Sequence, residues 1–398
     1  MTPRLFILYR GQSHMLKQGG VLLLTLMLLM LGSCRDEDVI FVPEEVNVAA
    51  PVYDSISGFY VLNEGNMGTN KATLDWYSAT QGKYYRNIFA HANPTEPMEM
   101  GDVGNDIGIY GSKLYAVINC SNKIDVMDKH SVKKIGQINI PNCRYIKFYK
   151  GYAYITSYAG PVKLDPEYKQ RGYVAKVDTA TLQVVDTCLV GFQPDQLEIL
   201  NGKIYVANSG GYMVPNYENT LSVIDIESFS EVERVPIAIN LLGVKSDKRG
   251  MLWVISRGDY FGVLSNIYVY NTRTRHIEKA MDIPASNYWL DGDSLYVIST
   301  QWSYITKKNE ISYAIINTAS MKTVTRNFIT DGTDKEIRIP YGIAVNPISK
   351  DIYVTDAKDY VSPGRLYCFG QDGKQKWNVR TGDIPAHFVF LGNNTNKQ

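Results

Sequence analysis

Leu114-Tyr115-Ala116-Val117, an apolar run with one aromatic residue that follows a turn, is repeated along the chain and decides the fold. The other copies are Phe59-Tyr60-Val61, Ala153-Tyr154-Ile155, Ile204-Tyr205-Val206, Leu252-Trp253-Val254, Leu295-Tyr296-Val297 and Ile352-Tyr353-Val354. Neighbouring copies lie roughly 40–57 residues apart, which is the repeat length of β-propeller blades with inserted loops. The spacing therefore predicts seven similar β-sheets.

A second repeated phrase follows most copies and alternates between apolar and polar residues. It reads Lys123-Ile124-Asp125-Val126-Met127-Asp128, Tyr173-Val174-Ala175-Lys176-Val177-Asp178, Leu221-Ser222-Val223-Ile224-Asp225, Asn266-Ile267-Tyr268-Val269-Tyr270 and Arg365-Leu366-Tyr367-Cys368-Phe369. Alternation with period two is typical of a half-buried strand. A weaker, edge-like strand follows, as at 134–138 and 183–186. No stretch beyond the N-terminal region shows a sustained helical period.

The two ends of the repeat region complement each other. Pro385-Ala386-His387-Phe388-Val389-Phe390-Leu391 resembles the first strand of a blade, yet no second strand follows it. The first copy, beginning at Gly58, starts with what should be a second strand. We therefore expect an all-β, seven-bladed β-propeller over residues 58–398, closed by the C-terminal strand. Two stacked β-sandwich domains are the alternative, but they do not explain the complementary ends.

Residues 1–33 have the features of a secretory signal. Basic residues precede the apolar run from Val21 to Leu31, which is too short for a comfortable membrane span. Leu31-Gly32-Ser33-Cys34 resembles the bacterial lipobox, which predicts that Cys34 is lipidated and becomes the first mature residue. An uncleaved anchor helix is the alternative. Translation from Met1 and from Met15 both leave a usable signal.

Residues 34–57 are expected to form the lipidated Cys and a flexible acidic tether. Arg35-Asp36-Glu37-Asp38 resembles the surface-export signal of Bacteroidetes lipoproteins. We therefore expect an outer-membrane protein, held only by its lipid anchor and facing the cell exterior.

The composition of the chain limits the kinds of molecule that it is expected to bind. The chain has 398 residues, with Lys+Arg 41 against Asp+Glu 40, so no basic surplus is available for nucleic acid. Its 29 tyrosines suit β-strands and aromatic binding surfaces.

The four cysteines after Cys34 form no C-x-x-C motif. They are interpreted as isolated thiols, with Cys120–Cys143 the first disulfide to test if one forms after export.

The two faces of the propeller are expected to differ. Connections after first strands are short hairpin turns such as Asn201-Gly202-Lys203, whereas connections after second strands are longer and rich in polar and aromatic residues. Such loops suit a ligand-binding face. The candidate ligand-binding residues are Asn63, Glu64, Asn66, Tyr158, Asn208, Tyr212, Arg257, Tyr260, Gln301, Trp302, Asp356 and Tyr360. The alternative is that these side chains only satisfy backbone groups at the blade ends.

Catalytic motifs are absent from the sequence. No histidine pair has metal-ligand spacing, and there is neither a G-x-S-x-G elbow nor a phosphate-binding glycine motif. We expect no catalytic residues, no metal and no cofactor. The face with the longer, polar loops also has the carboxylates Glu64, Asp259, Asp356 and Asp359. Two of them could form an acid/base pair once the chain is folded.

Three stretches carry a family resemblance: Tyr60-Val61-Leu62-Asn63-Glu64-Gly65-Asn66, Ile352-Tyr353-Val354-Thr355-Asp356-Ala357-Lys358-Asp359-Tyr360, and Gly382-Asp383-Ile384-Pro385-Ala386-His387-Phe388. Together they resemble the Bacteroidetes surface layer lipoproteins of the YncE-like seven-bladed propeller family. That family includes a surface lipoprotein that captures cobalamin and passes it to a TonB-dependent outer-membrane transporter. The resemblance implies capture of cobalamin or a related corrinoid. A glycan- or peptide-binding module is the second hypothesis, and a lactonase-like propeller hydrolase is the third.

Overall fold

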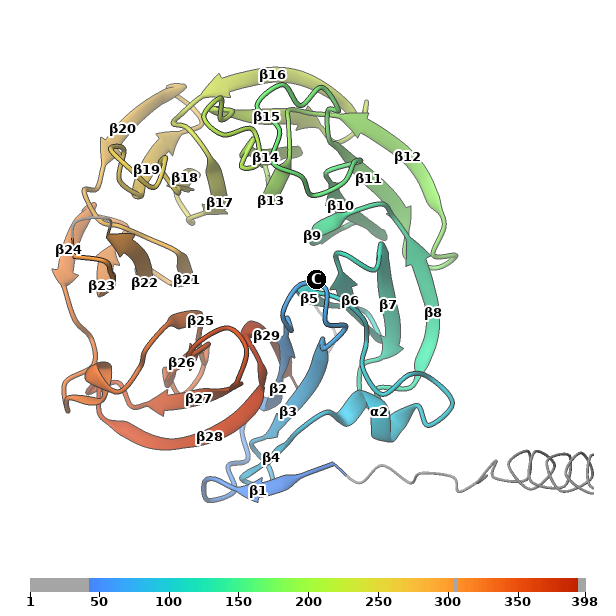
Figure 1. Cartoon of the computed structure of the whole chain (residues 1–398), viewed down its shortest axis with the longest axis vertical. Helices are drawn as coiled ribbons and strands as arrows, with labels where there is room; N and C mark the ends of the chain where they lie inside the picture. The colour runs from blue at the N-terminus through green and yellow to red at the C-terminus, as the bar shows by residue number, and fades with distance from the viewer. Residues whose placement is uncertain (1–42, 304–305, 393–398) are drawn as a thin grey trace, which may run out of the picture. The chain divides into compact units, whose positions relative to one another are not determined.

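Seven antiparallel sheets form a ring around a central axis in the computed structural model, which describes residues 43–303 and 306–392 (Figure 1). One strand of each sheet lies next to the axis, and the others follow outward. This arrangement confirms the predicted seven-bladed propeller.

Six sheets have four strands each. From the axis outward they are β5 (Gly104–Tyr110), β6 (Lys113–Ile118), β7 (Lys123–Asp128) and β8 (Lys134–Asn139); β9 (Cys143–Tyr149), β10 (Tyr152–Ser157), β11 (Tyr173–Asp178) and β12 (Val184–Leu189); β13 (Pro194–Leu200), β14 (Lys203–Asn208), β15 (Thr220–Asp225) and β16 (Ser230–Pro236); β17 (Leu241–Ser246), β18 (Met251–Ser256), β19 (Asn266–Asn271) and β20 (His276–Ala280); β21 (Asn287–Asp291), β22 (Ser294–Ser303), β23 (Lys308–Asn317) and β24 (Lys322–Thr325); and β25 (Pro340–Val345), β26 (Ile352–Asp356), β27 (Pro363–Phe369) and β28 (Gln375–Asp383).

The seventh sheet joins the two ends of the repeat region. Its order from the axis is β29 (Pro385–Gly392), β2 (Ile56–Asn63), β3 (Thr73–Ser78), β4 (Lys83–Tyr85) and β1 (Glu45–Asn47). β29 pairs with β2 from Ile56↔Gly392 to Asn63↔Pro385. The predicted closure by the C-terminal strand is thereby confirmed. A short helix, α2 (Ile88–Ala92), and a 3-10 turn, η1 (Thr333–Lys335), lie between strands.

The segment before β2 differs from the expected free tether. β1 pairs with β4 through Glu45↔Tyr85 to Asn47↔Lys83. The backbone N–H groups of Val48 and Val52 donate to the carbonyls of Gly82 and Ala79. Residues 43–57 are therefore largely bound to the first blade. The signal, Cys34, and the Met1 and Met15 starts lie outside the described residues.

The repeated phrases are the second and third strands of the blades. β7 and β11 have the bounds of the second phrase, and every copy of the first phrase lies in a second strand. Second strands are buried on both faces, since β6 has only its first residue partly exposed. Tyr115 and Trp253 are fully buried between adjacent blades. Burial on both faces therefore explains the unbroken apolar runs.

Short turns connect first and second strands, as predicted. Asn201 and Gly202 have φ values of 51° and 75°, which is the left-handed pair that a type I′ hairpin requires. The cysteines at 120, 143, 188 and 368 are all free, so the candidate Cys120–Cys143 disulfide is not formed. Among the described residues, no helix is long and apolar enough to cross a membrane.

Candidate ligand-binding site

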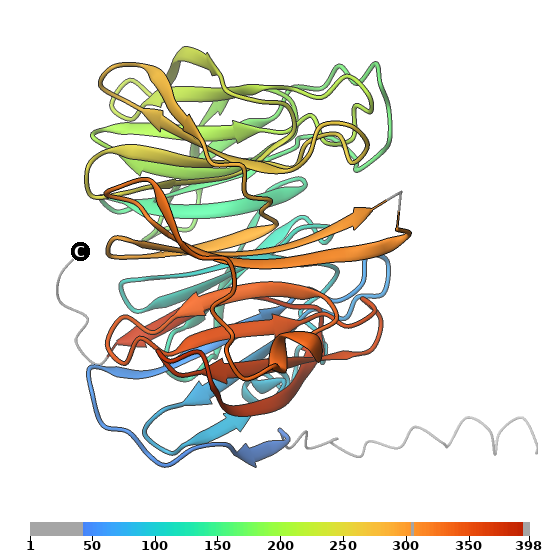
Figure 2. The same cartoon turned by 90° about the vertical axis from the view of Figure 1, so that its left-hand side faces the viewer.

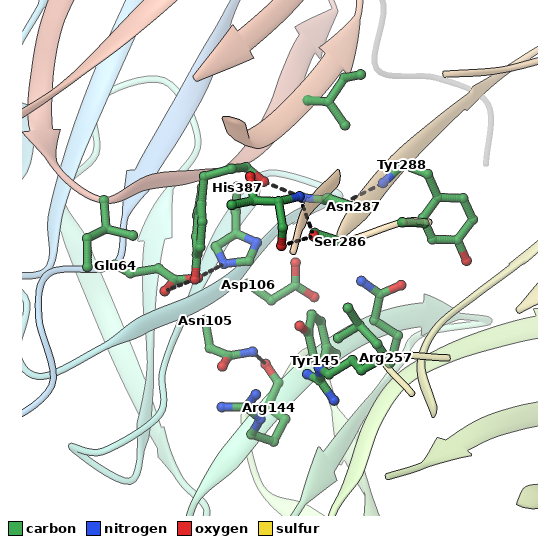
Figure 3. Close-up of a pocket in the computed structure, with 18 of the residues that line it drawn as sticks. Glu64, Asn105, Asp106, Arg144, Tyr145, Arg257, Ser286, Asn287, Tyr288 and His387 are labelled. Carbon is green, nitrogen blue, oxygen red and sulfur yellow. Dashed lines mark hydrogen bonds and ion pairs between the residues drawn. The ribbon is translucent and has the colours of Figure 1, made fainter. Parts of the chain in front are cut away.

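A pocket of about 890 Å³ lies at the axis of the propeller. Its walls come from the inner strands, and its mouth from loops after the second strands. Figure 3 shows wall residues such as Asp106, Tyr145 and His387. Figure 2 shows that β22 and β23 extend beyond the other strands at one end of the ring, where Trp302 and Asn309 face each other in register. Both residues line the pocket.

The inner strands contribute equivalent positions to the pocket. One apolar residue of each inner strand pairs with the centre of the neighbouring second strand, as in Ile107↔Ala116, Ile146↔Ile155 and Phe388↔Val61. The preceding residue in the seven strands is Asp106, Tyr145, Gln196, Gly243, Asn287, Gly342 or His387. All of these except the two glycines line the pocket. The pocket wall is thus a ring of polar side chains set by strand register.

Gly342 allows two inner strands to approach each other. A Cβ atom at this position would lie 2.5 Å from the backbone oxygen of Ala386 on β29. Any side chain there would therefore push β25 away from the closing sheet.

A buried carboxylate holds two arginines at the pocket wall. Arg144 donates from Nε and Nη2 to Asp195 Oδ1 at 3.2 and 3.1 Å, and Arg257 donates from Nη1 to Asp195 Oδ2 at 2.8 Å. The hydroxyl of Tyr158 also donates to Oδ1, at 2.9 Å. Burial alone would raise the pKa of Asp195, but Arg257 and Arg144 outweigh it and the pKa is lowered. Asp195 is therefore a fixed anion behind two cations.

A second cluster joins the mouth to β29. Glu64 Oε1 lies 3.0 Å from His387 Nε2, and Glu64 Oε2 accepts a 2.8 Å hydrogen bond from the Tyr341 hydroxyl. Burial and the neighbouring Glu64 raise the pKa of Tyr341 well above its ordinary value. Tyr341 is therefore a hydrogen-bond donor at neutral pH. Glu64 and His387 lie together, apart from Arg144 and Arg257 (Figure 3).

The deeper part of the pocket is lined by charged groups from three inner strands, and Glu198 of a fourth lies beside them. Lys147 Nζ lies 3.4 Å from Glu198 Oε2. Burial, followed by the charge of Lys147, lowers the pKa of Lys245 to about 8. On the facing wall, burial raises the pKa of Asp106, although His387 and a bond from the backbone N–H of Ile146 act to lower it. Two lysine side chains, Lys147 and Lys245, therefore lie below the arginine pair.

The structure brings seven of the twelve predicted residues to this pocket, and they are Glu64, Tyr212, Arg257, Tyr260, Gln301, Trp302 and Tyr360. Arg257 and Tyr260 come from the same loop after β18. Whether these residues bind a ligand stays a prediction.

The other five predicted residues support the fold around the pocket. Asn63 and Asn208 are fully buried and donate to hydroxyls of the adjacent third strands. Asp356 is 2% exposed and accepts hydrogen bonds from the backbone N–H groups of Ile339 and Lys358. Their burial leaves no surface for a ligand, so they match the structural alternative.

Asn66 and Tyr158 do not line the pocket but contact residues that do. Asn66 donates to the backbone oxygen of Tyr360 at 3.1 Å. Tyr158 is 3% exposed, and its ring lies 4.8 Å below the Arg144 guanidinium. Both position residues that line the pocket.

The carboxylates considered for hydrolysis do not gather together. Asp259 and Asp359 accept hydrogen bonds from backbone N–H groups of their own loops, at Phe261 and Ser362 among others. Asp356 is buried at a strand end. Of these four carboxylates, Glu64 alone lines the pocket, where its partners are His387 and Tyr341. Within the described residues, no group of three or more His, Cys, Asp or Glu side chains could hold a metal ion.

The sequence-based prediction missed the inner-strand residues that line most of the wall, such as Asn105, Arg144, Lys147, Lys245 and Tyr341. The available signal was positional, since Asn105, Arg144 and Tyr341 lie two positions before the apolar residue that pairs with the second strand. Lys147 and Lys245 lie directly after it.

Comparison with solved structures shows the fold. A putative 6-phosphogluconolactonase from Bacteroides fragilis is similar at a TM-score of 0.56 and 10% identity, with 86% of this chain and 100% of that chain covered. A quinonprotein alcohol dehydrogenase-like protein from Bacteroides thetaiotaomicron is similar at 0.54 and 14% identity, covering 85% and 79%. The Kuenenia stuttgartiensis hydrazine synthase is similar at 0.53 and 16% identity, covering 68% and 77%.

No curated protein matches the chain. One family does match, over residues 57–390, which include every strand from β3 to β28 and nearly all of the closing pair. The chain therefore belongs to the family described as "Domain of unknown function (DUF5074)".

Proposed function

We propose that this protein captures a polar solute in its axial pocket at the outer surface of the cell, with cobalamin or a related corrinoid as the first ligand to test. Three aromatic side chains carry the proposal. Tyr260, Trp302 and Tyr360 line the pocket and are 42%, 46% and 39% exposed. Large aromatic groups that stay exposed at a pocket mouth give a ligand contact area at low entropic cost.

The shape and chemistry of the pocket support capture of a ligand with a polar rim. Its volume of about 890 Å³ is in the range of small-molecule sites. Amides from Asn105, Gln196 and Asn287 line the wall below the aromatic mouth. Cobalamin is a wide disc with amides around its edge, and the exposed mouth suits a ligand wider than the pocket itself. The resemblance of residues 60–66 and 382–388 to surface layer lipoproteins supports the same ligand and a TonB-dependent transporter as partner.

A glycan is the second candidate, because aromatic faces beside amides and carboxylates also suit sugar rings. A glycan array separates it from the first candidate. The Glu64–His387 contact favours a hydrolase as a third candidate, since a histidine beside a carboxylate can act as a general base. Release of product from a lactone panel is the readout for that candidate, and we propose binding without turnover.

Replacing Trp302 with alanine is expected to weaken cobalamin binding about tenfold or more, because a tryptophan at the mouth of a pocket is the kind of contact that dominates binding energy. Isothermal titration and the absorbance change of cobalamin measure the effect on purified protein. Tyr53→Ala is the matched control, since Tyr53 is 80% exposed and precedes the end of β2 opposite the pocket mouth. The corrinoid proposal would be rejected if W302A and wild type bound cobalamins with equal affinity. It would also be rejected if wild type bound no cobalamin.

The proposed location depends on Cys34. Changing Cys34 to alanine is expected to remove the protein from the outer-membrane fraction, because no other lipid attachment is predicted and a surface position requires the anchor. Fractionation followed by immunoblotting measures the distribution, with Cys188→Ala as the control. Equal membrane recovery of C34A and wild type would contradict lipid anchoring at this residue.

A further inference from the structure

We propose that Arg144 and Arg257 form an anion subsite in the axial pocket, which takes a carboxylate or phosphate group of the captured ligand. This inference rests on the proposed function, because it concerns the same pocket. It goes further by assigning a charge and a functional group to the ligand.

The charge balance at Asp195 leaves one positive charge over. Two guanidiniums share a single carboxylate, at 3.1 Å from Arg144 and 2.8 Å from Arg257. Asp195 is fully buried and does not line the pocket, whereas both arginines do. A ligand therefore meets the two cations and not the anion that holds them.

The arginines keep hydrogen-bond donors available. Within residues 43–303 and 306–392, the hydrogen bonds of Arg144 use Nε and Nη2, and those of Arg257 use Nη1. The Nη1 group of Arg144 and the Nε and Nη2 groups of Arg257 remain. Guanidinium groups fixed by a buried carboxylate lose little entropy when they bind an oxyanion, and their donors match its geometry.

The other carboxylates of the pocket are already occupied. Glu64 is held by His387 and Tyr341, and Asp106 accepts from the backbone N–H groups of Ile107 and Ile146. Figure 3 shows Glu64 on the side of His387, away from Arg144 and Arg257. No carboxylate other than Asp195 neutralises the two arginines among the described residues.

The floor of the pocket adds to the positive potential. Lys147 and Lys245 both line it, while their counter-ion Glu198 does not. The groups that act on Lys245 are Lys147 from β9, Glu198 from β13 and Asp106 from β5, and its ammonium lies over the rings of Tyr288 and Trp289. An anion bound above would favour the protonated amine, so binding is expected to take up a proton near pH 8.

The test measures anion binding by the purified full chain. Inorganic sulfate and phosphate represent tetrahedral oxyanions, and citrate represents carboxylates. Titration calorimetry is expected to show millimolar binding by wild type, about tenfold or more weaker in Arg257→Gln, because a charge-assisted bond is lost. Arg326→Gln, at an exposed position just after β24, is the matched control and is expected to bind like wild type.

Two further measurements test the anion subsite independently of the Arg257→Gln variant. Arg257→Lys retains the charge and is expected to fall between wild type and R257Q, which covers the case in which R257Q does not fold. Sulfate keeps its charge between about pH 6 and about pH 9, so its binding is expected to weaken above pH 8, and Lys245→Met is expected to remove that dependence. Equal anion affinity in wild type, R257K and R257Q, or no binding of any of the three anions, would overturn the subsite.

The two proposals fail in different ways. If cobalamin or a glycan binds R257Q as tightly as wild type, the anion subsite is wrong and capture stands. If sulfate or citrate binds through Arg257 while no cobalamin or glycan binds at all, the subsite stands and the proposed ligands are wrong.

Discussion

Replacing Asp195 with asparagine is expected to lower the free energy of unfolding by about 3 kcal/mol, because it removes the carboxylate charge that balances two largely buried arginines. The asparagine oxygen can still accept hydrogen bonds from one guanidinium, but its NH2 group cannot accept from the other. Arg144 and Arg257 would then repel each other at the pocket wall. Urea unfolding at neutral pH measures the loss.

The pH dependence of the same variant gives a second check. The folded pKa of Asp195 is lowered, so its stabilising contribution is present above the unfolded pKa of about 4 and is lost as the pH falls through the folded pKa. D195N lacks this term, so its deficit relative to wild type should shrink below about pH 4. Asp372→Asn is the control, since its side chain is 63% exposed and faces Lys374 at 3.9 Å. A D195N protein as stable as D372N would show that the buried pair contributes little.

Replacing Phe59 with alanine is expected to cost about 3–5 kcal/mol of folding free energy, because the ring is 1% exposed and fills the seam where the propeller closes. Its centroid lies 4.6 Å from Tyr353 of the last four-stranded blade and 5.7 Å from Phe388 of β29. The cavity left behind would loosen both neighbours of β2. We expect a lower urea midpoint than that of wild type.

Phe261→Ala is the control for this prediction. Phe261 is 70% exposed on the loop after β18, so its removal should change stability by less than about 0.5 kcal/mol. An F59A protein with the midpoint of F261A would mean that the closing seam does not limit stability.

The strands could be predicted from the sequence where burial is complete. Second strands pack on both faces, so each must be apolar along its length. The repeated apolar runs, such as Leu114–Val117, are the result. Inner strands line the pocket with consecutive residues, such as Arg144 to Lys147, so their composition follows the pocket as well as the core. Tyr145 and Asn287 therefore carried no repeated signal. β1 was missed because its three residues are all exposed.

The candidate site was predicted only in part, for a physical reason. Polar residues at the ends of second strands serve two purposes that a sequence does not distinguish. Asn208 donates to a hydroxyl inside its own blade, whereas Arg257, the residue directly after β18, reaches the pocket. The difference depends on which side chain points toward the axis, and that is fixed by tertiary packing.

The sheet shared by β2 and β29 constrains how the chain folds during synthesis. The Ser57 hydroxyl donates to the Leu391 carbonyl across 334 positions of sequence. Until β29 has left the ribosome, β2 presents an open edge that other chains could extend. Contacts this distant in sequence also slow folding. We therefore expect nascent chains of this protein to depend on chaperones until translation is nearly complete.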